Sequence, residues 1–214
     1  MNIDDVYSVI ATHFDETRHT PWPSVLEFIK AQTGADAVLD LGCGNGKYLP
    51  ALLEAAKHVS ACDPCVELLA CAKAKVSESD KERVEFAMCS GNWLPYADAS
   101  FDAVICIAVF HHLRSVLERQ TFMAQIARVL KPQGSAYLTV WNTPGIKWRH
   151  VNDSHDANDY YVPWHDKHSG RVYDRFYHVL SVGELFELAH GAGLRITTLR
   201  NERGNWHVVL EPSV

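Results

Sequence analysis

The stretch VLDLGCGNGKY, residues 38–48, constrains the fold more than any other part of this chain. A short apolar run containing Asp40 leads into three alternate glycines, Gly42, Gly44 and Gly46, and a helical pattern of apolar residues follows at once. Glycine has no side chain, so it permits both a tight turn and a close approach of ligand to backbone. A strand that enters a helix through such a turn is typical of nucleotide sites in α/β proteins, although an ordinary strand–helix turn can show the same pattern.

The chain beyond residue 35 alternates between strand-like and helix-like patterns. The expected strands cover residues 36–41, 58–63, 83–88, 102–109 and 135–141, and the expected helices cover residues 46–56, 65–77 and 116–130. Strands that alternate with helices in this way predict an α/β fold with a doubly wound, mostly parallel sheet and helices on both faces. The last two apolar runs, LRITTLR and NWHVVLE, predict a terminal antiparallel hairpin, which makes the sheet seven-stranded.

Two segments stand outside this alternation. Residues 1–34 carry two short amphipathic helices, expected over residues 2–14 and around 23–29, and Gly34 ends the second. Residues 142–180 are polar and rich in aromatic and histidine side chains, which predicts a long loop that is not disordered. We therefore expect one domain over residues 1–214, with residues 1–34 as an N-terminal helical lid and 142–180 as a substrate-side insertion.

Composition narrows the class of protein. No apolar run reaches membrane-spanning length and the first residues are acidic, which predicts a cytosolic or nuclear protein without a membrane partner. The net charge of −6 does not indicate a nucleic-acid binder, although a local basic patch is compatible with it. Cys62 and Cys65 have a metal-like spacing, but no second pair matches them, so no metal site is expected.

The order of these features indicates the cofactor. Asp63 ends the second expected strand about 20 residues beyond the glycine turn, where an acid binds ribose hydroxyls in dinucleotide-binding and S-adenosylmethionine-binding sheets alike. The G-x-G-x-G spacing, the acidic Asp40 before the turn and the terminal hairpin together resemble the class I methyltransferase (Rossmann-like) fold. That resemblance implies S-adenosyl-L-methionine as cofactor and S-adenosyl-L-homocysteine as its product, with Asp40 near the methionine ammonium.

Six segments carry a narrower resemblance over nearly the whole chain: HFDETRHTPWP, LDLGCGNGKYL, IAVFHHL, VPWH, RFYHV and GNWHVVL. Together they resemble the eukaryotic tRNA wobble-uridine methyltransferases, which convert 5-carboxymethyluridine to its methyl ester. The resemblance implies a tRNA anticodon loop as substrate. It also implies a small zinc-binding activator subunit, which would pair along the apolar edge strand Val84–Cys89 and without which the chain would be poorly soluble. One departure is Ser90, where relatives carry an acid that often meets the adenine amino group.

The same resemblance implies a set of site residues. The cofactor-binding candidates are His13, Arg18, Asp40, Gly42, Cys43, Gly44, Asn45, Lys47, Asp63, Ser90, Gly91, Asn92, Ala108 and His112. The catalytic candidates are Arg18, His111, Trp141, Arg175 and His178. The substrate-binding candidates are Trp22, Trp164, Tyr177, Asn205 and Trp206, of which Trp206 is as well explained by packing against the core.

The acceptor chemistry calls for an arginine clamp. A carboxylate with an ordinary pKa near ~4 is ionised at neutral pH, so the enzyme must orient it and exclude water rather than deprotonate it. Arg18 is the first candidate because a guanidinium fork matches a carboxylate; the alternative is a surface arginine that pairs with Asp15 or Glu16. His111 and His112 follow the fourth expected strand, and adjacent residues of an extended chain point to opposite faces, so His111 is expected to contact substrate and His112 to be structural or cofactor-lining.

Three functions are open at this point. The first is esterification of a tRNA wobble carboxymethyluridine. The second is methylation of a small molecule, such as a free carboxylic acid or a quinone precursor, on the same fold. The third is a catalytically silent paralogue that binds a cofactor or a partner. The aromatic and cationic content of residues 142–180 favours the first over the second, and the intact glycine turn, Asp63 and Arg18 speak against the third.

Overall fold

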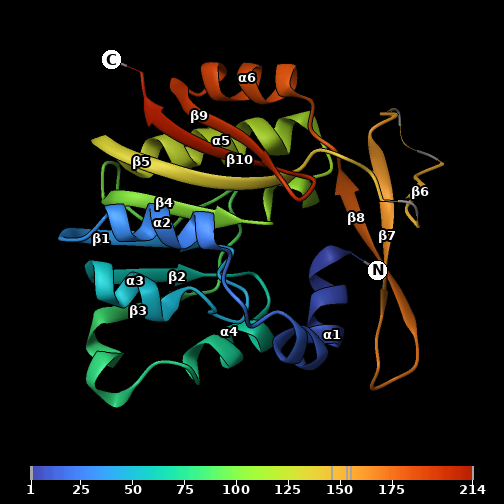
Figure 1. Cartoon of the computed structure of the whole chain (residues 1–214), viewed down its shortest axis with the longest axis horizontal. Coiled ribbons are helices and arrows are strands. Elements are labelled where there is room, and N and C mark those ends of the chain that lie inside the picture. Colours follow the sequence, from blue (N-terminus) through green and yellow to red (C-terminus); the bar gives the residue numbers. More distant parts are fainter. Residues whose placement is uncertain (1, 146, 153, 155, 214) are drawn as a thin grey trace.

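A seven-stranded sheet forms the centre of the computed structural model, which describes residues 2–145, 147–152, 154 and 156–213. Its strands are β1 (Ala35–Leu41), β2 (Ala56–Cys62), β3 (Val84–Ala87), β4 (Phe101–Ile107), β5 (Leu130–Trp141), β9 (Leu194–Glu202) and β10 (Asn205–Pro212). Their order is β3-β2-β1-β4-β5-β10-β9 (Figure 1). The first five strands are parallel, and β10 runs antiparallel to β5 and β9. The predicted mostly parallel sheet with an antiparallel hairpin is confirmed.

Helices cover both faces of this sheet because its buried strands carry apolar side chains on both faces. Val38 of β1 packs in a core with α2 (Pro23–Ala31), α3 (Leu49–Ala55) and α4 (Val66–Lys73). Leu39 of the same strand packs on the other face with α5 (Val116–Val129) and α6 (Val182–Gly191). A short 3-10 turn, η1 (Glu78–Arg83), precedes β3. Among the described residues, no helix is long and apolar enough to span a membrane.

The helix after the glycine turn is shorter than the helix predicted over residues 46–56, because the turn extends further along the chain than expected. Gly46 has φ +72°, outside the helical region, and α3 begins only at Leu49, with Pro50 in its first turn. Proline is favoured there because the missing N–H would have had no partner within the helix. The turn therefore spans the whole interval between β1 and Leu49, and the N–H groups of Gly42 and Cys43 both donate to the Cys62 carbonyl at the end of β2.

Residues 142–180 contain a second sheet, so the prediction of a long loop is wrong. β6 (Arg149–His150), β7 (Asp159–His165) and β8 (Val172–His178) form a three-stranded antiparallel sheet in that order. The register of β7 and β8 pairs Trp164 with Tyr173 and Tyr160 with Tyr177, which gives one face of this insertion sheet large side chains to bury. Figure 1 shows it standing beside the carboxyl ends of the central strands, with α1 (Ile3–Thr17) next to the lower half of β7 and β8.

Candidate active site

The glycine turn after β1 is held by Asp63 at the end of β2. The Gly44 N–H donates to Asp63 Oδ2 at 2.8 Å, and the Cys65 N–H donates to Asp63 Oδ1 at 2.9 Å. Burial raises the pKa of Asp63 to about 6. Gly42 has φ +73°, and a Cβ there would lie 2.3 Å from Val109 Cγ2, so the turn requires glycine at this position. The ribose contact of Asp63 stays a prediction.

Asp40 lies in β1, just before this turn, and carries a buried carboxyl group. Its side chain is 1% exposed, and among the described residues its Oδ2 atom has no hydrogen-bond partner. Burial first, and then the neighbouring Asp63, raise the pKa of Asp40 to about 7, which Lys47 only partly opposes. A buried carboxylate that lacks a counterion is costly unless a ligand supplies the positive charge. The ammonium end of S-adenosylmethionine has the charge that fits this position.

Asn45 joins the glycine turn to α1. Its Nδ2 donates to Asp15 Oδ1 at 2.8 Å and to the Arg18 carbonyl at 3.4 Å, while Lys75 Nζ donates to the Asn45 carbonyl at 2.7 Å. Lys75 also pairs with Asp15. The N-terminal helix is thereby fixed over the turn, and the side chain of Asn45 is used for that attachment.

His13 fixes the same helix to the insertion sheet. Its Nδ1 accepts hydrogen bonds from Trp164 Nε1–H at 3.2 Å and from the Lys167 N–H at 3.3 Å. A ring nitrogen that accepts is unprotonated, so the contact of this atom with Asp166 at 3.2 Å is not an ion pair. His13 is buried, and its predicted cofactor contact stays a prediction.

Two arginines share the ring of Trp164. The guanidinium carbons of Arg18 and Arg175 each lie 4.9 Å from the ring centroid, Arg18 from the end of α1 and Arg175 from β8. Asp15 and Glu16, the alternative partners of Arg18, pair with other side chains. Arg175 is buried, and among the described residues its Nε has no hydrogen-bond partner and neither arginine forms a salt bridge. Both guanidinium groups thus contact the same aromatic ring, and neither pairs with an acid among the described residues.

His111 and His112 lie on the 3-10 turn η2 (Phe110–His112), so the prediction that they continue an extended strand is wrong. His111 is fully buried and stacks on Tyr177 at 4.3 Å, and neither of its ring nitrogens has a partner among the described residues. Burial holds the pKa of His111 well below its ordinary value, so the ring is neutral.

The ring of His112 is fixed on both sides. Its Nδ1 lies 2.8 Å from the Phe176 carbonyl, which can only accept, so Nδ1 carries the proton. Its Nε2 therefore accepts from the Tyr7 hydroxyl at 3.0 Å. Burial lowers the pKa of His112 to about 3. Of the two histidines, His111 is the one whose ring nitrogens lack hydrogen-bond partners among the described residues.

The remaining candidates on the acceptor side have mixed surroundings. Trp141 is half-buried at the end of β5, and Asn205, its neighbour in β10, is buried with Oδ1 unpartnered among the described residues. Trp206 donates to the Leu180 carbonyl at 3.2 Å and packs against the main core, which supports the packing explanation. Trp22 is half-buried, and the Lys47 ammonium lies 5.6 Å from its ring centroid.

The remaining cofactor candidates lie along the same edge of the sheet. Cys43 is buried in the turn, and Lys47 is half-buried there, with a pKa lowered by burial. Ala108, just after β4, has φ +60°, a strained value for a residue with a Cβ. After β3, Ser90 is exposed, whereas Gly91 is buried against Phe122 and Asn92 Oδ1 lacks a partner among the described residues.

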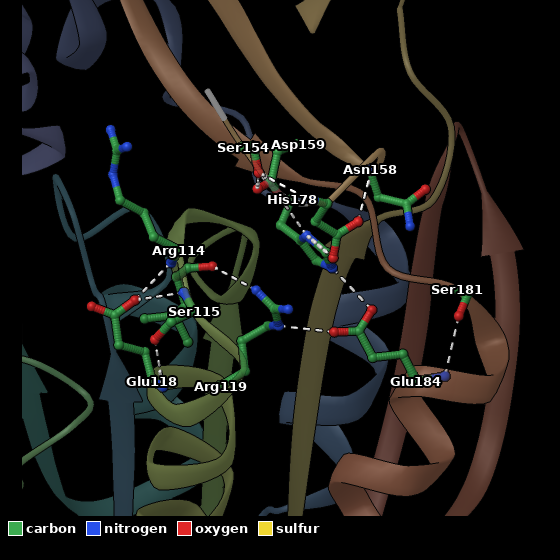
Figure 2. Close-up of polar contacts among 12 residues, drawn as sticks. Arg114, Ser115, Glu118, Arg119, Ser154, Asn158, Asp159, His178, Ser181 and Glu184 are labelled. Carbon is green, nitrogen blue, oxygen red and sulfur yellow. Dashed lines mark hydrogen bonds and ion pairs between the residues drawn. The ribbon is translucent and has the colours of Figure 1, made fainter. Parts of the chain in front are cut away.

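His178 occupies a different environment from the other catalytic candidates. It is fully buried, and both of its ring nitrogens face carboxylates, Nδ1 toward Asp159 at 2.7 Å and Nε2 toward Glu184 at 2.9 Å (Figure 2). The neighbouring Tyr177 faces His111, so successive side chains of β8 point to opposite faces of the insertion sheet. With both nitrogens occupied, His178 has no free group to offer a substrate.

Sequence reasoning did not single out three residues that line this region. Tyr7 reaches His112 from α1, while Trp148 and Tyr160 extend the aromatic surface around Tyr177. The Trp148 ring lies 5.3 Å from that of Tyr177 and 5.2 Å from that of Trp141. The only signal for Trp148 and Tyr160 was the aromatic density of residues 142–180, and Tyr7 had none beyond its place in an amphipathic helix.

Comparison with known proteins identifies the family. A family model described as a methyltransferase domain matches residues 39–138. The Schizosaccharomyces pombe tRNA (carboxymethyluridine(34)-5-O)-methyltransferase is 31% identical, over 98% of this chain and 95% of its own length. The chain belongs to the tRNA (carboxymethyluridine(34)-5-O)-methyltransferase family. The resemblance predicted from the six sequence segments is thereby confirmed.

Other members of the family are longer. The mouse enzyme ALKBH8 is 36% identical over 65% of this chain, and the match spans 20% of its own length. The Arabidopsis thaliana member is 38% identical over 64% of this chain and 31% of its own length. The chain therefore spans nearly all of the fission-yeast relative but only a minor part of these two.

Solved structures support the fold. A Clostridium acetobutylicum S-adenosylmethionine-dependent methyltransferase has a TM-score of 0.76 at 15% identity, over 98% of this chain and 100% of that one. A Haloferax volcanii putative methyltransferase, solved in complex with the Trm112 methyltransferase activator, has a TM-score of 0.67 at 20% identity, over 100% of this chain and 99% of that one. Both likenesses concern the class I methyltransferase fold.

Proposed function

We propose that this protein transfers a methyl group from S-adenosylmethionine to the carboxylate of 5-carboxymethyluridine at the wobble position of tRNA. The observation that carries the proposal is the pair of guanidinium groups, Arg18 and Arg175, on the ring of Trp164. A buried guanidinium without a carboxylate is costly, and an anionic substrate would remove that cost. The name and activity of the fission-yeast relative support the same substrate.

The two arginines would hold and orient the acceptor carboxylate. Arg175 is fixed between Trp164 and Tyr177, with its guanidinium carbon 5.2 Å from the Tyr177 ring centroid, while the exposed Arg18 can adjust from the end of α1. S-adenosylmethionine supplies an electrophilic methyl group when it is bound. Because the acceptor is already ionised, orientation by these side chains is the main contribution expected, up to roughly 7–11 kcal/mol.

The neutral His111 suits the same site. Its two unpartnered ring nitrogens provide one donor and one acceptor next to the stacked Tyr177 ring. A neutral imidazole can hydrogen-bond the uracil or its carboxymethyl group without adding a charge that would weaken the nucleophile. Asp40 would meet the cofactor ammonium on the opposite side of the glycine turn, and Asp63 would meet its ribose.

The aromatic surface beside the arginines would take the target base and its neighbours. Tyr177, Trp148, Trp141 and Tyr160 have ring centroids within 6.2 Å of at least one other ring of the group. A splayed anticodon base stacks well on such rings, and stacking contributes about 1–3 kcal/mol per base. This surface favours an RNA acceptor over a free carboxylic acid.

A small zinc-binding activator subunit would dock along β3. This strand is at the edge of the central sheet, and Met88 and Trp93, which follow it, are 70% and 67% exposed. An unpaired edge flanked by large apolar side chains is suited to strand addition by a partner. The Haloferax volcanii neighbour, which is complexed with an activator, supports this proposal. We propose a cytosolic or nuclear location from composition alone.

Methyl transfer from labelled S-adenosylmethionine to tRNA carrying carboxymethyluridine, with the activator present, tests the proposal. Arg175→Lys should reduce the transfer rate about 100-fold or more while cofactor binding stays unchanged, because lysine lacks the planar fork. The control is Arg171→Lys, an exposed arginine in the β7–β8 loop, which should leave the rate unchanged. Equal rates for both variants would remove Arg175 from the site. Transfer to free carboxylic acids but not to tRNA would support a small-molecule acceptor instead.

A further inference from the structure

A chain of charged side chains links the insertion sheet to two helices of the main domain (Figure 2). Asp159 begins β7, His178 ends β8, Glu184 lies in the first turn of α6, and Arg119 lies in α5. His178 Nδ1 is 2.7 Å from Asp159 Oδ1, and His178 Nε2 is 2.9 Å from Glu184 Oε2. Glu184 Oε1 is 2.8 Å from Arg119 Nε. We refer to these four residues as the latch.

One end of the latch reaches the turn that carries the active-site histidines. Arg119 is 1% exposed, and its Nη1 donates to the Leu113 carbonyl at 3.1 Å. Leu113 directly follows His112 at the end of η2. The position of η2 is therefore tied to α5 and, through Glu184, to α6.

The other end of the latch reaches the acceptor side of the active site. His178 directly follows Tyr177, and Arg175 is two residues earlier on the same strand. Tyr177 and Arg175 face the active site, while His178 faces the latch. The latch thus fixes the two surfaces that must meet around the acceptor, namely η2 with His111 and β8 with Arg175 and Tyr177.

The latch requires a charged imidazole. Both ring nitrogens of His178 face carboxylate oxygens, which accept only, so both nitrogens must carry protons. Burial alone would lower the pKa of His178, but hydrogen bonds to Glu184 and Asp159 outweigh it and raise the pKa above its ordinary value, although Arg119 opposes them. The half-buried Asp156 also faces Nδ1, at 3.8 Å.

The charges in this cluster nearly cancel when His178 is protonated. His178 and Arg119 then balance Asp159 and Glu184, and Asp156 adds one partly exposed negative charge. Loss of the His178 proton would leave one carboxylate facing a nitrogen lone pair at hydrogen-bond distance. Because an unmatched charge in a buried position is costly, the β8 end would move away from α6.

We propose that Asp159, His178, Glu184 and Arg119 are positioning residues that form a protonation-dependent latch and hold the acceptor-binding face of the insertion sheet against η2. This role rests on the proposed function, because it assigns the latch to the acceptor step rather than to cofactor binding. The cofactor residues Asp40 and Asp63 come from β1 and the end of β2, and among the described residues no hydrogen bond or ion pair joins them to a latch residue.

The sign of the pH dependence follows from the direction of the shift. A His whose folded pKa is raised contributes its stabilisation fully below the unfolded pKa near ~6.5 and loses it as the pH rises through the folded pKa. The transfer rate should therefore fall on the alkaline side of that folded value, while cofactor affinity is not affected by the latch. A merely structural ion cluster would change the stability of the protein without producing this split.

Glu184→Gln in the full chain with its activator provides the test. A neutral amide keeps the shape but removes the charge that favours the imidazolium, so the alkaline limb of the single-turnover rate should shift to lower pH by about one unit or more. Hydrogen exchange of residues 159–165 and 172–178 in the absence of tRNA should show the same shift. Glu187→Gln, an exposed glutamate on the same helix, is the matched control, and Asp159→Asn replaces Glu184→Gln if that variant does not fold.

The outcomes separate the latch from the proposed function. Parallel shifts in rate and exchange, with unchanged S-adenosylhomocysteine affinity, support the latch. Identical profiles for Glu184→Gln and Glu187→Gln overturn it, as does a shift in exchange without a shift in rate. A third outcome is that no variant transfers methyl to tRNA, while the hydrogen exchange of β7 and β8 still shifts in Glu184→Gln. The proposed function and the positioning role then both fail, and only the protonation-dependent contact of His178 stands.

Discussion

Asp40→Asn tests whether the buried carboxyl group at the end of β1 is completed by a cation of the cofactor. The side chain is 1% exposed, and among the described residues its Oδ2 lacks a hydrogen-bond partner. Burial and Asp63 raise its pKa to about 7, so the carboxyl group is partly protonated at neutral pH in the ligand-free protein. A bound ammonium group would favour the ionised form, and binding should therefore release a proton.

The magnitude follows from this pKa. With a pKa of about 7, the ionised fraction is about 0.09 at about pH 6 and about 0.76 at about pH 7.5. The affinity for S-adenosylhomocysteine should then be about eightfold weaker at about pH 6 than at about pH 7.5, because only the ionised form of Asp40 pairs with the ammonium. Asn cannot ionise, so the variant should bind roughly 10- to 100-fold more weakly at the higher pH, as expected for the loss of a hydrogen bond to a charged group. The affinity of the Asp40→Asn variant should still change with pH, but less than that of the unmodified chain, because Asp63 has a pKa of about 6.

Isothermal titration calorimetry with S-adenosylhomocysteine measures both quantities. Titrations at the two pH values give the affinities, and two buffers with different ionisation enthalpies give the number of protons released. Asp36→Asn, an exposed aspartate of the same strand, is the control and should behave as the unmodified chain does. Equal affinity at both pH values, no proton release and full affinity in Asp40→Asn would refute the pairing of Asp40 with the ammonium.

Four further substitutions test other parts of the structure. Gly42→Ala should lower the free energy of unfolding, measured by denaturant titration, by about 2 kcal/mol or more and abolish cofactor binding, because its Cβ would meet Val109 at 2.3 Å and its φ is +73°. In Gly44→Ala the new Cβ would meet nothing nearer than 3.8 Å, so the same titration should show a loss of only about 1–2 kcal/mol. Trp148→Ala should raise the KM for tRNA by about 5- to 100-fold, through the loss of one stacking contact, without changing cofactor affinity, and an unchanged KM would argue against the aromatic surface. Met88→Glu should weaken activator binding measured by pull-down; wild-type binding by this variant would move the proposed interface away from β3.

The central sheet could be predicted because its information is local. β4 is a nearly continuous apolar run, and the carboxyl-terminal parts of β1 and β5 are mostly apolar. A glycine turn precedes α3, and a capping pair marks the start of α5. The insertion sheet could not be predicted in the same way. In β8 the face toward the active site carries Tyr173, Arg175 and Tyr177, and the other face carries Asp174, Phe176 and His178, so both faces mix polar and apolar side chains.

The residues of the site differ in the same way in how far the sequence predicts them. Asp40, Gly42 and Asp63 follow from position relative to the strand ends, which a sequence displays directly. The partners of His178 do not, because Asp159 and Glu184 meet it only after β7, β8 and α6 have packed together. Tyr7 likewise reaches His112 across 105 residues of sequence. Contacts that depend on how separate elements dock leave no trace in the periodicity of any one of them.

The identity of the methylated nucleoside tests the proposed function most directly. The chain and its activator subunit would be incubated with S-adenosylmethionine and tRNA bearing 5-carboxymethyluridine. The tRNA would then be digested to nucleosides, and their masses would be measured by mass spectrometry. We expect the wobble nucleoside to gain one methyl group that mild alkali removes as methanol, as an ester requires. An unmodified wobble nucleoside, in a preparation that binds S-adenosylhomocysteine, would contradict the proposal.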